Sequence, residues 1–504
     1  MDEKSIIIIG GGIAGLSAGC YARLNHYRTQ IFEQDTRPGG LNTCWDRGHY
    51  TINGGLAFLM GSGPGTAFYR IWEELGVVPK MRMIEYEHLI IVEGREGQKF
   101  YMYNDLDRLE KHMKKLAPED KGPIEDFIKG ARVYTRYDMP VDKAPELMTF
   151  GDKMKLILKR FPLIRTMRKW KKITIRDFSA RFKDPFLREA IFQAKALFSE
   201  DVPVLLFQMA CALGHKKSAG FPEGGALKLS QAMEHYYREL RGEINYRSRV
   251  EKILVENNRA VGVRLEDGSE HRADTVITAA DGRTTIFKML DGKYVDAKIS
   301  GYYDHLPLGP SPLVVALGVK RAFEDVPHAA AGTVFPLNEP VTIAGKEVEW
   351  LRPMIYNFDA SFAPPGKTVV RFVFDTDYEY WRTLGVNPDG YRVEKEQIAG
   401  KLIMAMEEKF PGFSDQIEMW DVATPLTFER YTGNWKGSAL GWDCTTETFF
   451  KPMSKTLPGL DNFYMAGQWV EPGGGVPGAA MSGRNVIQII CKRDKKPFVT
   501  RLPI

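Results

Sequence analysis

The chain has no long uninterrupted hydrophobic run. Of its 504 residues, the longest apolar candidate covers residues 202–213 and is interrupted by Pro203 and Gln208, whereas a membrane-spanning helix needs roughly 18–20 apolar residues. The first five residues, Met-Asp-Glu-Lys-Ser, lack the basic segment and cleavage site of a signal peptide. The sequence therefore predicts no transmembrane helix and no secretion signal, and we expect a cytoplasmic protein.

Cysteine is scarce and scattered. No two cysteines have Cys-x-x-Cys spacing, and the nine histidines show no His-x-x-x-His spacing. These absences argue against a disulfide framework and against a zinc site, and they are typical of a reducing compartment. We therefore expect no metal in the functional site. The five cysteines are Cys20, Cys44, Cys211, Cys444 and Cys491.

The composition is that of an ordinary globular protein, with 44% hydrophobic and 26% charged residues. Because 504 residues exceed the usual size of one hydrophobic core, two domains are expected.

The first informative pattern is a strand–helix–strand unit around a glycine-rich turn. Residues 5–10 form an apolar run typical of a buried parallel strand, residues 14–25 show a helical pattern, and residues 29–33 suggest a second strand. The turn, Gly10-Gly11-Gly12-Ile13-Ala14-Gly15, has Gly-x-Gly-x-x-Gly spacing. Its glycines allow a tight turn, a close approach to a pyrophosphate and close helix packing, while Glu33 is placed to accept from ribose hydroxyls. The unit predicts a dinucleotide site.

The residues that follow distinguish between NAD and FAD. Arg37-Pro38-Gly39-Gly40 comes soon after Glu33, and an acidic residue followed by Gly-Gly at this distance resembles the pattern of flavin-dependent amine oxidases and carotenoid desaturases. That pattern usually continues with Arg, whereas this chain has Leu41. No second glycine-rich nucleotide motif follows, so we expect no separate NAD(P)H domain.

Three further segments resemble the phytoene desaturase-like family of carotenoid and retinoid oxidoreductases. Near the C-terminus, residues 462–467 and Pro-Gly-Gly-Gly-Val-Pro-Gly at 472–478 match its last signature. Residues 221–225, Phe-Pro-Glu-Gly-Gly, and the strands between Arg249 and Asp281 match its middle. Residues 48–55 match its flavin-edge segment, with Asn53 where Asp is common.

The resemblance implies an α/β fold with a glutathione-reductase-like, Rossmann-type FAD domain and an inserted α+β substrate domain. We assign residues 1–84, 218–300 and 455–504 to the FAD domain, and residues 85–217 and 301–454 to the substrate domain. It also implies non-covalent FAD, with a second helix start near residue 478 aimed at the flavin. The expected cofactor residues are Gly10, Gly12, Ile13, Ala14, Gly15, Glu33, Gln34, Gly39, Gly40, Leu41, Gly55, Val250, Gly467, Gly475 and Val476.

The implied reaction is hydride exchange between FAD and a C–C or C=C bond of a lipophilic polyene or isoprenoid-like substrate. Desaturation, saturation and isomerisation stay open, and a quinone, oxygen or another partner would exchange the electrons. Glu471, next to the last glycine cluster, is the candidate for proton transfer, since an acid in an apolar pocket can act near neutrality; a loop acid is the alternative. A flavin amine oxidase, and a binding protein that keeps FAD structurally, are the competing functions.

One segment departs from the even charge distribution. Residues 152–176 contain ten Lys or Arg and one Asp, interleaved with bulky apolar residues. This pattern is typical of an interfacial segment that contacts anionic lipid, with Phe161, Leu163, Ile164, Met167 and Trp170 at the headgroup boundary and Pro162 breaking the helix. Solvated helices packed on the substrate domain are the alternative. The segment lacks a phosphate-binding loop, and we expect no nucleic-acid partner.

Overall fold

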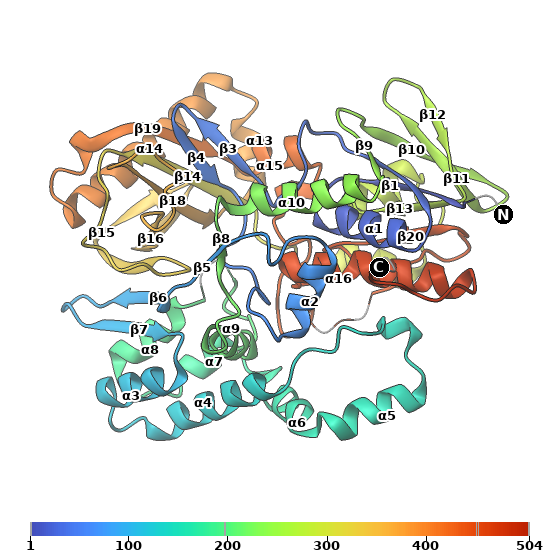
Figure 1. Cartoon of the computed structure of the whole chain (residues 1–504). Coiled ribbons are helices and arrows are strands. Elements are labelled where there is room, and N and C mark those ends of the chain that lie inside the picture. The colour runs from blue at the N-terminus through green and yellow to red at the C-terminus, as the bar shows by residue number, and fades with distance from the viewer. Residues whose placement is uncertain (1–2, 196–197, 450, 452, 502–504) are drawn as a thin grey trace.

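The structure, a computed structural model, describes residues 3–195, 198–449, 451 and 453–501. Its first sheet is parallel and joins strands from the start, the middle and the end of the chain in the order β20-β13-β1-β2-β9 (Figure 1). The five strands are β1 (Ser5–Ile9), β2 (Arg28–Phe32), β9 (Glu243–Asn245), β13 (Thr275–Thr278) and β20 (Phe463–Met465).

The two faces of this sheet are covered by different elements. In β1, Ile6 and Ile8 join a core with helices α1 (Ile13–Leu24), α10 (Gly225–Glu239) and α16 (Gly475–Arg493). Ile7 and Ile9 join a second core under a three-stranded antiparallel sheet formed by β10 (Val250–Glu256), β11 (Arg259–Leu265) and β12 (Glu270–Arg272). Because successive residues of a strand point to opposite faces, one continuous apolar strand supplies both cores.

The elements expected from the glycine-rich unit are confirmed with small shifts. The two strands and the helix of the N-terminal unit are β1, β2 and α1, and α16 begins three residues before the expected position. The turn at Asn257 and Asn258 joins β10 to β11 with φ of 49° and 58°, and Gly268, φ 86°, closes the next hairpin. Asn and Gly tolerate these left-handed conformations, so both tight turns form without strain.

A second sheet lies in the other half of the molecule. Its central strand β14 (Pro312–Val319) pairs antiparallel with β18 (Thr368–Asp375) and β19 (Ile417–Ala423), and β17 (Met354–Ile355) lies on the far side of β18. Leu313, Val315 and Leu317 pack against helix α14 (Pro388–Lys409). The alternate residues of β14, including Val314, therefore point to the opposite face, toward the interior of the molecule.

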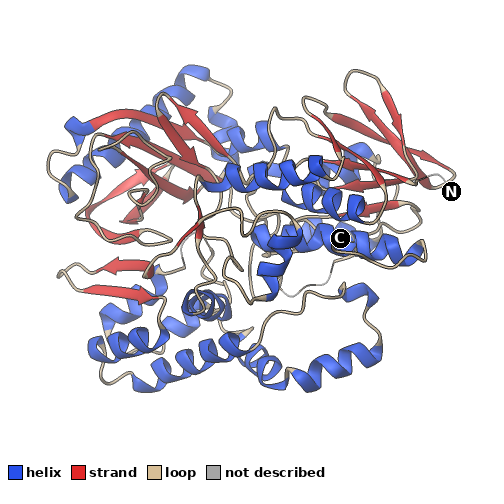
Figure 2. Cartoon of the chain, viewed as in Figure 1, coloured by secondary structure: helices blue, strands red, loops and turns tan. Residues whose placement is uncertain are grey.

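A third sheet includes a hairpin from the region that follows residue 85. This region is mostly helical, but β6 (His88–Glu93) and β7 (Lys99–Tyr103) form a hairpin that joins β15 (Thr333–Ile343) and β16 (Lys346–Leu351) in the order β16-β15-β6-β7 (Figure 2). The hairpin is short, and its partner strand β15 lies more than 200 residues away in the chain. The sequence around the hairpin is typical of helices and does not indicate these strands.

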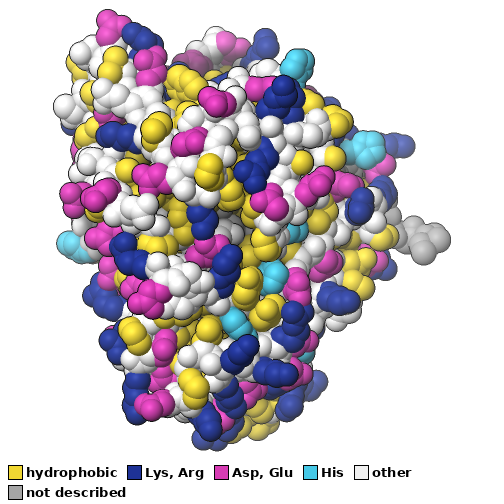
Figure 3. All heavy atoms as spheres, turned by 90° about the vertical axis from the view of Figure 1, so that its left-hand side faces the viewer, with side chains coloured by type: hydrophobic (Ala, Val, Ile, Leu, Met, Phe, Trp, Pro, Cys, Tyr) yellow, Lys and Arg dark blue, Asp and Glu magenta, His cyan; other side chains and the backbone are white. Residues whose placement is uncertain are grey.

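The helical region lies at the lower end of the molecule in Figure 1. Lys and Arg side chains gather at that end on the face shown in Figure 3. Helix α5 ends at Lys159 and α6 begins at Phe161, with Pro162 in its first turn, so the predicted break at Pro162 is confirmed. The helices are α3 (Leu106–Leu116), α4 (Lys121–Arg136), α5 (Phe150–Lys159), α6 (Phe161–Trp170), α7 (Ile175–Ser179), α8 (Pro185–Gln193) and α9 (Leu205–His215).

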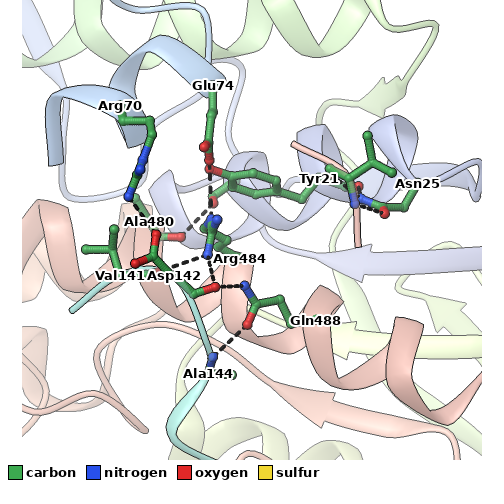
Figure 4. Close-up of polar contacts among 12 residues, drawn as sticks. Tyr21, Asn25, Arg70, Glu74, Val141, Asp142, Ala144, Ala480, Arg484 and Gln488 are labelled. Atoms are coloured by element: carbon green, nitrogen blue, oxygen red, sulfur yellow. Dashed lines mark hydrogen bonds and ion pairs between the residues drawn. The ribbon is translucent and has the colours of Figure 1, made fainter. Parts of the chain in front are cut away.

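A buried polar cluster ties the segment before α5 to the parallel-sheet half (Figure 4). Arg484 of α16 forms an ion pair of 3.3 Å with Glu74 and donates a hydrogen bond of 2.7 Å to the carbonyl oxygen of Val141. Tyr21 donates to the same Glu74 carboxylate at 2.6 Å. Gln488 accepts from the amide of Ala144 at 2.6 Å. The C-terminal helix thus anchors the connection that leads into the helical region.

A short hairpin connects the two halves near the center. Strands β3 (Cys44–Arg47) and β4 (Tyr50–Asn53) follow the first nucleotide-binding segment. Trp45 and Arg47 both donate hydrogen bonds to Asp421 of β19, each at 2.8 Å. The remaining α-helices and strands are α2 (Ala67–Glu74), β5 (Met83–Ile84), β8 (Phe221–Pro222), α11 (Gly282–Thr284), α12 (Ala297–His305), α13 (Tyr378–Leu384) and α15 (Pro425–Thr432). Among the described helices, none is long and apolar enough to cross a membrane.

Candidate functional site

A cavity of about 1280 Å³ runs between the two halves of the molecule. Its wall contains the turn after β1, the Gly39–Leu41 segment, Gly54 and Gly55, and the loop that leads from β20 into α16. Fourteen of the fifteen predicted cofactor residues line it: Gly10, Gly12, Ile13, Ala14, Glu33, Gln34, Gly39, Gly40, Leu41, Gly55, Val250, Gly467, Gly475 and Val476. Segments more than 400 residues apart in the chain therefore meet at one site.

Gly15 is the predicted cofactor residue that does not line the cavity. A Cβ atom at this position would lie 1.9 Å from the carbonyl oxygen of Gly10 and 3.4 Å from Ile8. Gly15 is thus required for close packing of α1 on β1, the role that the third glycine of such a turn has. At Gly12, by contrast, a Cβ would be no closer than 3.7 Å to any protein atom, so the space beside it is open to the cavity.

Glu33 follows the second strand and contacts the glycine-rich turn. Its two carboxylate oxygens accept hydrogen bonds from the amides of Gly11, at 2.6 Å, and Asp35, at 2.8 Å. The residue is 6% exposed, and burial raises the pKa of its carboxyl although these amides act in the opposite direction. The carboxylate is therefore fixed at the cavity wall, at the end of β2 where a ribose-binding acid is expected.

Asn53 replaces the more common acid of the flavin-edge segment for a local reason. Its side-chain oxygen accepts from the amide of Ala226 at 3.1 Å, at the start of α10, and its side-chain nitrogen donates to the carbonyl oxygen of Leu56 at 2.9 Å. The residue is fully buried. An amide can donate and accept at once, whereas an ionised carboxylate only accepts. Asn53 thereby holds Gly54 and Gly55 against the cavity.

The C-terminal side of the cavity is a loop followed by a helix start. The amide of Gly467 donates to the Ser482 hydroxyl at 2.9 Å, which fixes the end of β20 against α16. Gly475, Val476 and Pro477, the first residues of α16, line the cavity. The unpaired amides and positive dipole end of a helix start attract negative charge. Gln468 and Trp469 also line the cavity.

Glu471, the candidate for proton transfer, forms an ion pair beside the C-terminal loop. It is not among the residues that line the cavity, and its carboxylate lies 2.7 Å from Nζ of Lys455. Lys455 is buried and also pairs with Glu146 at 2.7 Å. Burial lowers the pKa of Lys455, but the two carboxylates outweigh it and the pKa is raised. This ion pair gives Glu471 a structural function, and proton transfer by Glu471 stays an unsupported prediction.

Sequence reasoning missed the residues on the other side of the cavity. There the wall is formed by apolar residues of β6 and α9, among them Leu89, Ile90 and Phe207, and by Arg352 and Arg371 near the second sheet. No motif marks these positions, because strand pairing rather than spacing along the chain brings them to the site. Leu41, which stands where the family pattern has Arg, packs against Val314, Ala423 and Phe428.

Comparison with known proteins agrees with this arrangement. The chain is 25% identical to the chloroplastic prolycopene isomerase of Arabidopsis thaliana, over 95% of this chain and 81% of that protein. It is 24% identical to a lycopene-forming phytoene desaturase of Pseudescherichia vulneris, over 95% and 98% of the two chains. A crystal structure of an oxidoreductase from Methanosarcina mazei superposes with a TM-score of 0.61 at 18% identity, covering 96% and 100%.

The match to a family extends over almost the whole chain. Residues 13–491 match the flavin containing amine oxidoreductases. The matched region includes α1, the strands of the parallel sheet other than β1, the second sheet and all but the last two residues of α16. With the glycine-rich turn, Glu33 and the C-terminal helix start gathered at one cavity, the protein is an FAD-dependent oxidoreductase that belongs to the family of flavin containing amine oxidoreductases.

Proposed function

We propose that this enzyme exchanges hydride between FAD and a C–C or C=C bond of a lipophilic polyene or isoprenoid-like substrate. The observation that carries the proposal is the continuity of the cavity. The wall with the glycine-rich turn and the start of α16 continues into a wall of apolar side chains from β6, α9 and the loop at Leu56. A long apolar molecule fits such a space, and burial of its surface contributes about 25 cal/mol for each Å².

The cofactor residues have separate tasks in this proposal. Gly12 and the amides at the start of α1 would hold the pyrophosphate, and Glu33 would accept from the ribose. The start of α16 lines the cavity, and its dipole would stabilise negative charge on a flavin bound there. Bound FAD accepts or supplies a hydride, while the apolar wall orients the substrate and excludes water. No described cysteine lines the cavity, which supports non-covalent binding.

The direction of the reaction determines the electron partner. In desaturation, bound FAD would take up a hydride while a base takes up a proton, and a second substrate, which we propose to be a quinone or oxygen, would accept the electrons. Saturation reverses these steps, and isomerisation involves no net transfer of electrons. The chain has no second glycine-rich motif for NAD(P)H, which supports direct exchange with a partner that enters the cavity or reaches the flavin edge.

Two measurements on the purified protein test this proposal. Extraction with organic solvent followed by mass spectrometry should identify a co-purified polyene or isoprenoid lipid. Anaerobic photoreduction should then give reduced flavin that is reoxidised by quinone, oxygen or a polyene. A flavin that none of these acceptors reoxidises would support the alternative of a binding protein that keeps FAD structurally.

The competing function of amine oxidation has less support at the site. An amine substrate is a cation at neutral pH, and binding it requires carboxylates or an aromatic cage. The substrate side of the cavity has Arg352 and Arg371 instead. Of the described aromatic residues that line the cavity, Trp435 and Trp469 are the pair in ring contact, with planes 35° apart. Oxidation of simple amines is therefore disfavoured.

We also propose that α5 and the start of α6 contact an anionic membrane surface. Helix α5 has no buried residue, and Phe150, Leu158 and Phe161 are 81%, 73% and 59% exposed. Lys153, Lys155 and Lys159 are exposed beside them, without a carboxylate partner among the described residues. Such a surface buries apolar side chains at the headgroup level while its cations meet anionic lipid.

Two of the residues expected at the membrane boundary are buried. Leu163 and Trp170 are 2% and 1% exposed and pack into the interior, so they cannot enter a bilayer. The apolar residues that face outward belong to α5 and to Phe161. Co-sedimentation with vesicles that contain anionic lipid tests the contact, and equal recovery with neutral vesicles would contradict the electrostatic part of it.

A further inference from the structure

The charged residues of the large cavity are unevenly distributed. Its carboxylates come from Glu33, from the strands and loops beside the first sheet, and from Glu429 on α15. The part bounded by β6, α9 and the second sheet contains Lys195, Arg352 and Arg371, and no carboxylate among the described residues. A cavity for a pure hydrocarbon does not require these cations, because burying a charge without a partner is unfavourable.

Arg371 is the most deeply placed of the three. It lies on β18 opposite Ala316 of β14 and Met354 of β17, and it is 3% exposed. Its guanidinium donates to the carbonyl oxygen of Asn53 and to the sulfur of Met354, and its Nε has no hydrogen-bond partner. No described carboxylate lies within ion-pair distance of it; a guanidinium has five N–H donors, and here only two are used.

Arg352 stands two residues before Met354 and is also incompletely paired. One terminal nitrogen donates to the carbonyl oxygen of Gln193, while its buried Nε has no partner. Burial lowers its pKa to about 10. It lines both the large cavity and a neighbouring cavity of about 740 Å³, with Lys195 at the same junction. Both arginines therefore line the large cavity together with Met354, to whose sulfur Arg371 donates.

We propose that the substrate is an amphipathic carboxylate, a long apolar chain whose acid group binds Arg352 and Arg371 while the chain lies along the β6 and α9 wall. The inference rests on the proposed function and narrows its substrate class. A carboxylate accepts several hydrogen bonds from a guanidinium fork and neutralises its charge, so it supplies what both side chains lack. Charge-assisted hydrogen bonds of this kind are among the strongest in proteins.

The test compares two ligands that differ only at the head, oleate and oleyl alcohol, added below micelle-forming concentration to FAD-loaded protein. Binding is followed by the change in flavin absorbance. We expect wild-type protein to bind oleate about ten- to hundredfold more tightly than the alcohol. Arg352→Gln and Arg371→Gln should each remove most of this preference, while Arg392→Gln, an exposed arginine on α14 with a side chain 62% exposed, should retain it.

Arg352→Gln is the safer variant, since Arg352 is only half-buried whereas Arg371 holds the Asn53 carbonyl. Equal binding of acid and alcohol by wild-type protein, or absence of oleate binding, would overturn the proposal. An unchanged preference for oleate in both variants would also overturn the proposal. The same holds if Arg371→Gln alters only FAD binding or the absorbance spectrum of the protein without ligand. If wild-type protein does not retain FAD, the proposed function is contradicted instead. That result concerns the cofactor and not the acid group of the ligand.

Discussion

At the scale of single residues, two glycines in the same turn have different tasks. A Cβ at Gly12 meets no protein atom within 3.7 Å, whereas a Cβ at Gly15 would lie 1.9 Å from the Gly10 carbonyl oxygen. We expect Gly12→Ala to fold, at a cost below about 1 kcal/mol, and to bind FAD at least about tenfold more weakly, since the methyl group occupies the pyrophosphate's space.

Gly15→Ala is the matched comparison and should lower the melting temperature of FAD-free protein, because α1 must move away from β1. Circular dichroism and titration of apoprotein with FAD separate the two effects. If both variants lose FAD affinity alone, or both lose stability alone, the division of roles between the two glycines is wrong.

The buried ion pair of Arg484 and Glu74 gives a second prediction at this scale. Both side chains are almost fully buried, at 5% and 3% exposure. Removing one partner leaves an uncompensated charge in the interior, so Arg484→Met should lower the free energy of unfolding by about 3–5 kcal/mol. The measurement is a denaturant midpoint followed by tryptophan fluorescence.

An exposed ion pair from the same region serves as the control for Arg484. Arg501 pairs with Glu73, with side chains 64% and 39% exposed, and Arg501→Gln should cost less than about 1 kcal/mol. Adding Glu74→Gln to Arg484→Met should recover part of the loss, because the unpaired charge is then gone. Absence of any recovery would mean that packing around Arg484, and not its charge, provides the stability.

At the scale of elements, α5 has a surface that no other part of the described chain covers. Replacing Phe150, Leu158 and Phe161 by Ser should reduce binding to anionic vesicles by at least about tenfold. The fold should be unaffected, since α5 contributes no buried residue and Phe161, the first residue of α6, is 59% exposed. Val386→Ser, which removes an apolar side chain 84% exposed elsewhere, is the control. Unchanged sedimentation of the triple variant would exclude α5 as the contact.

Local signals explain which elements could be predicted. The β1–α1–β2 unit and the β20–α16 pair were predictable because apolar runs, glycines and a helical pattern follow one another within about 30 residues. The break at Pro162 was equally local. The direction of the α6 side chains was not, because Leu163 and Trp170 are buried by contacts with elements elsewhere in the chain. Periodicity indicates an apolar face but not what covers it.

At the scale of the whole molecule, the site depends on pairings that no short segment specifies. Arg371 faces the cavity because β18 pairs with β14 and β17 in a particular register, and a shift by one residue would turn it to the opposite face. The resemblance at residues 221–225 and 462–478 located the cofactor side of the cavity. It carried no information on the substrate side, where residues 300–410 supply Arg352 and Arg371.

Bound FAD should stabilise the contact between distant parts of this chain, which thermal unfolding and proteolysis can measure. The cavity wall combines Gly12, Val250, Gly467 and Gly475, so one bound cofactor would contact the start, the middle and the end of the sequence. Binding to the folded state alone stabilises it by about 2.7 kcal/mol when free FAD is 100 times its Kd. We therefore expect the melting temperature to rise with FAD concentration, and protease cleavage in the loop before α16 to slow with it. Gly12→Ala should lose both effects together. If FAD protects the N-terminal turn but leaves cleavage near Gly473 unchanged, the two ends of the chain do not share the cofactor.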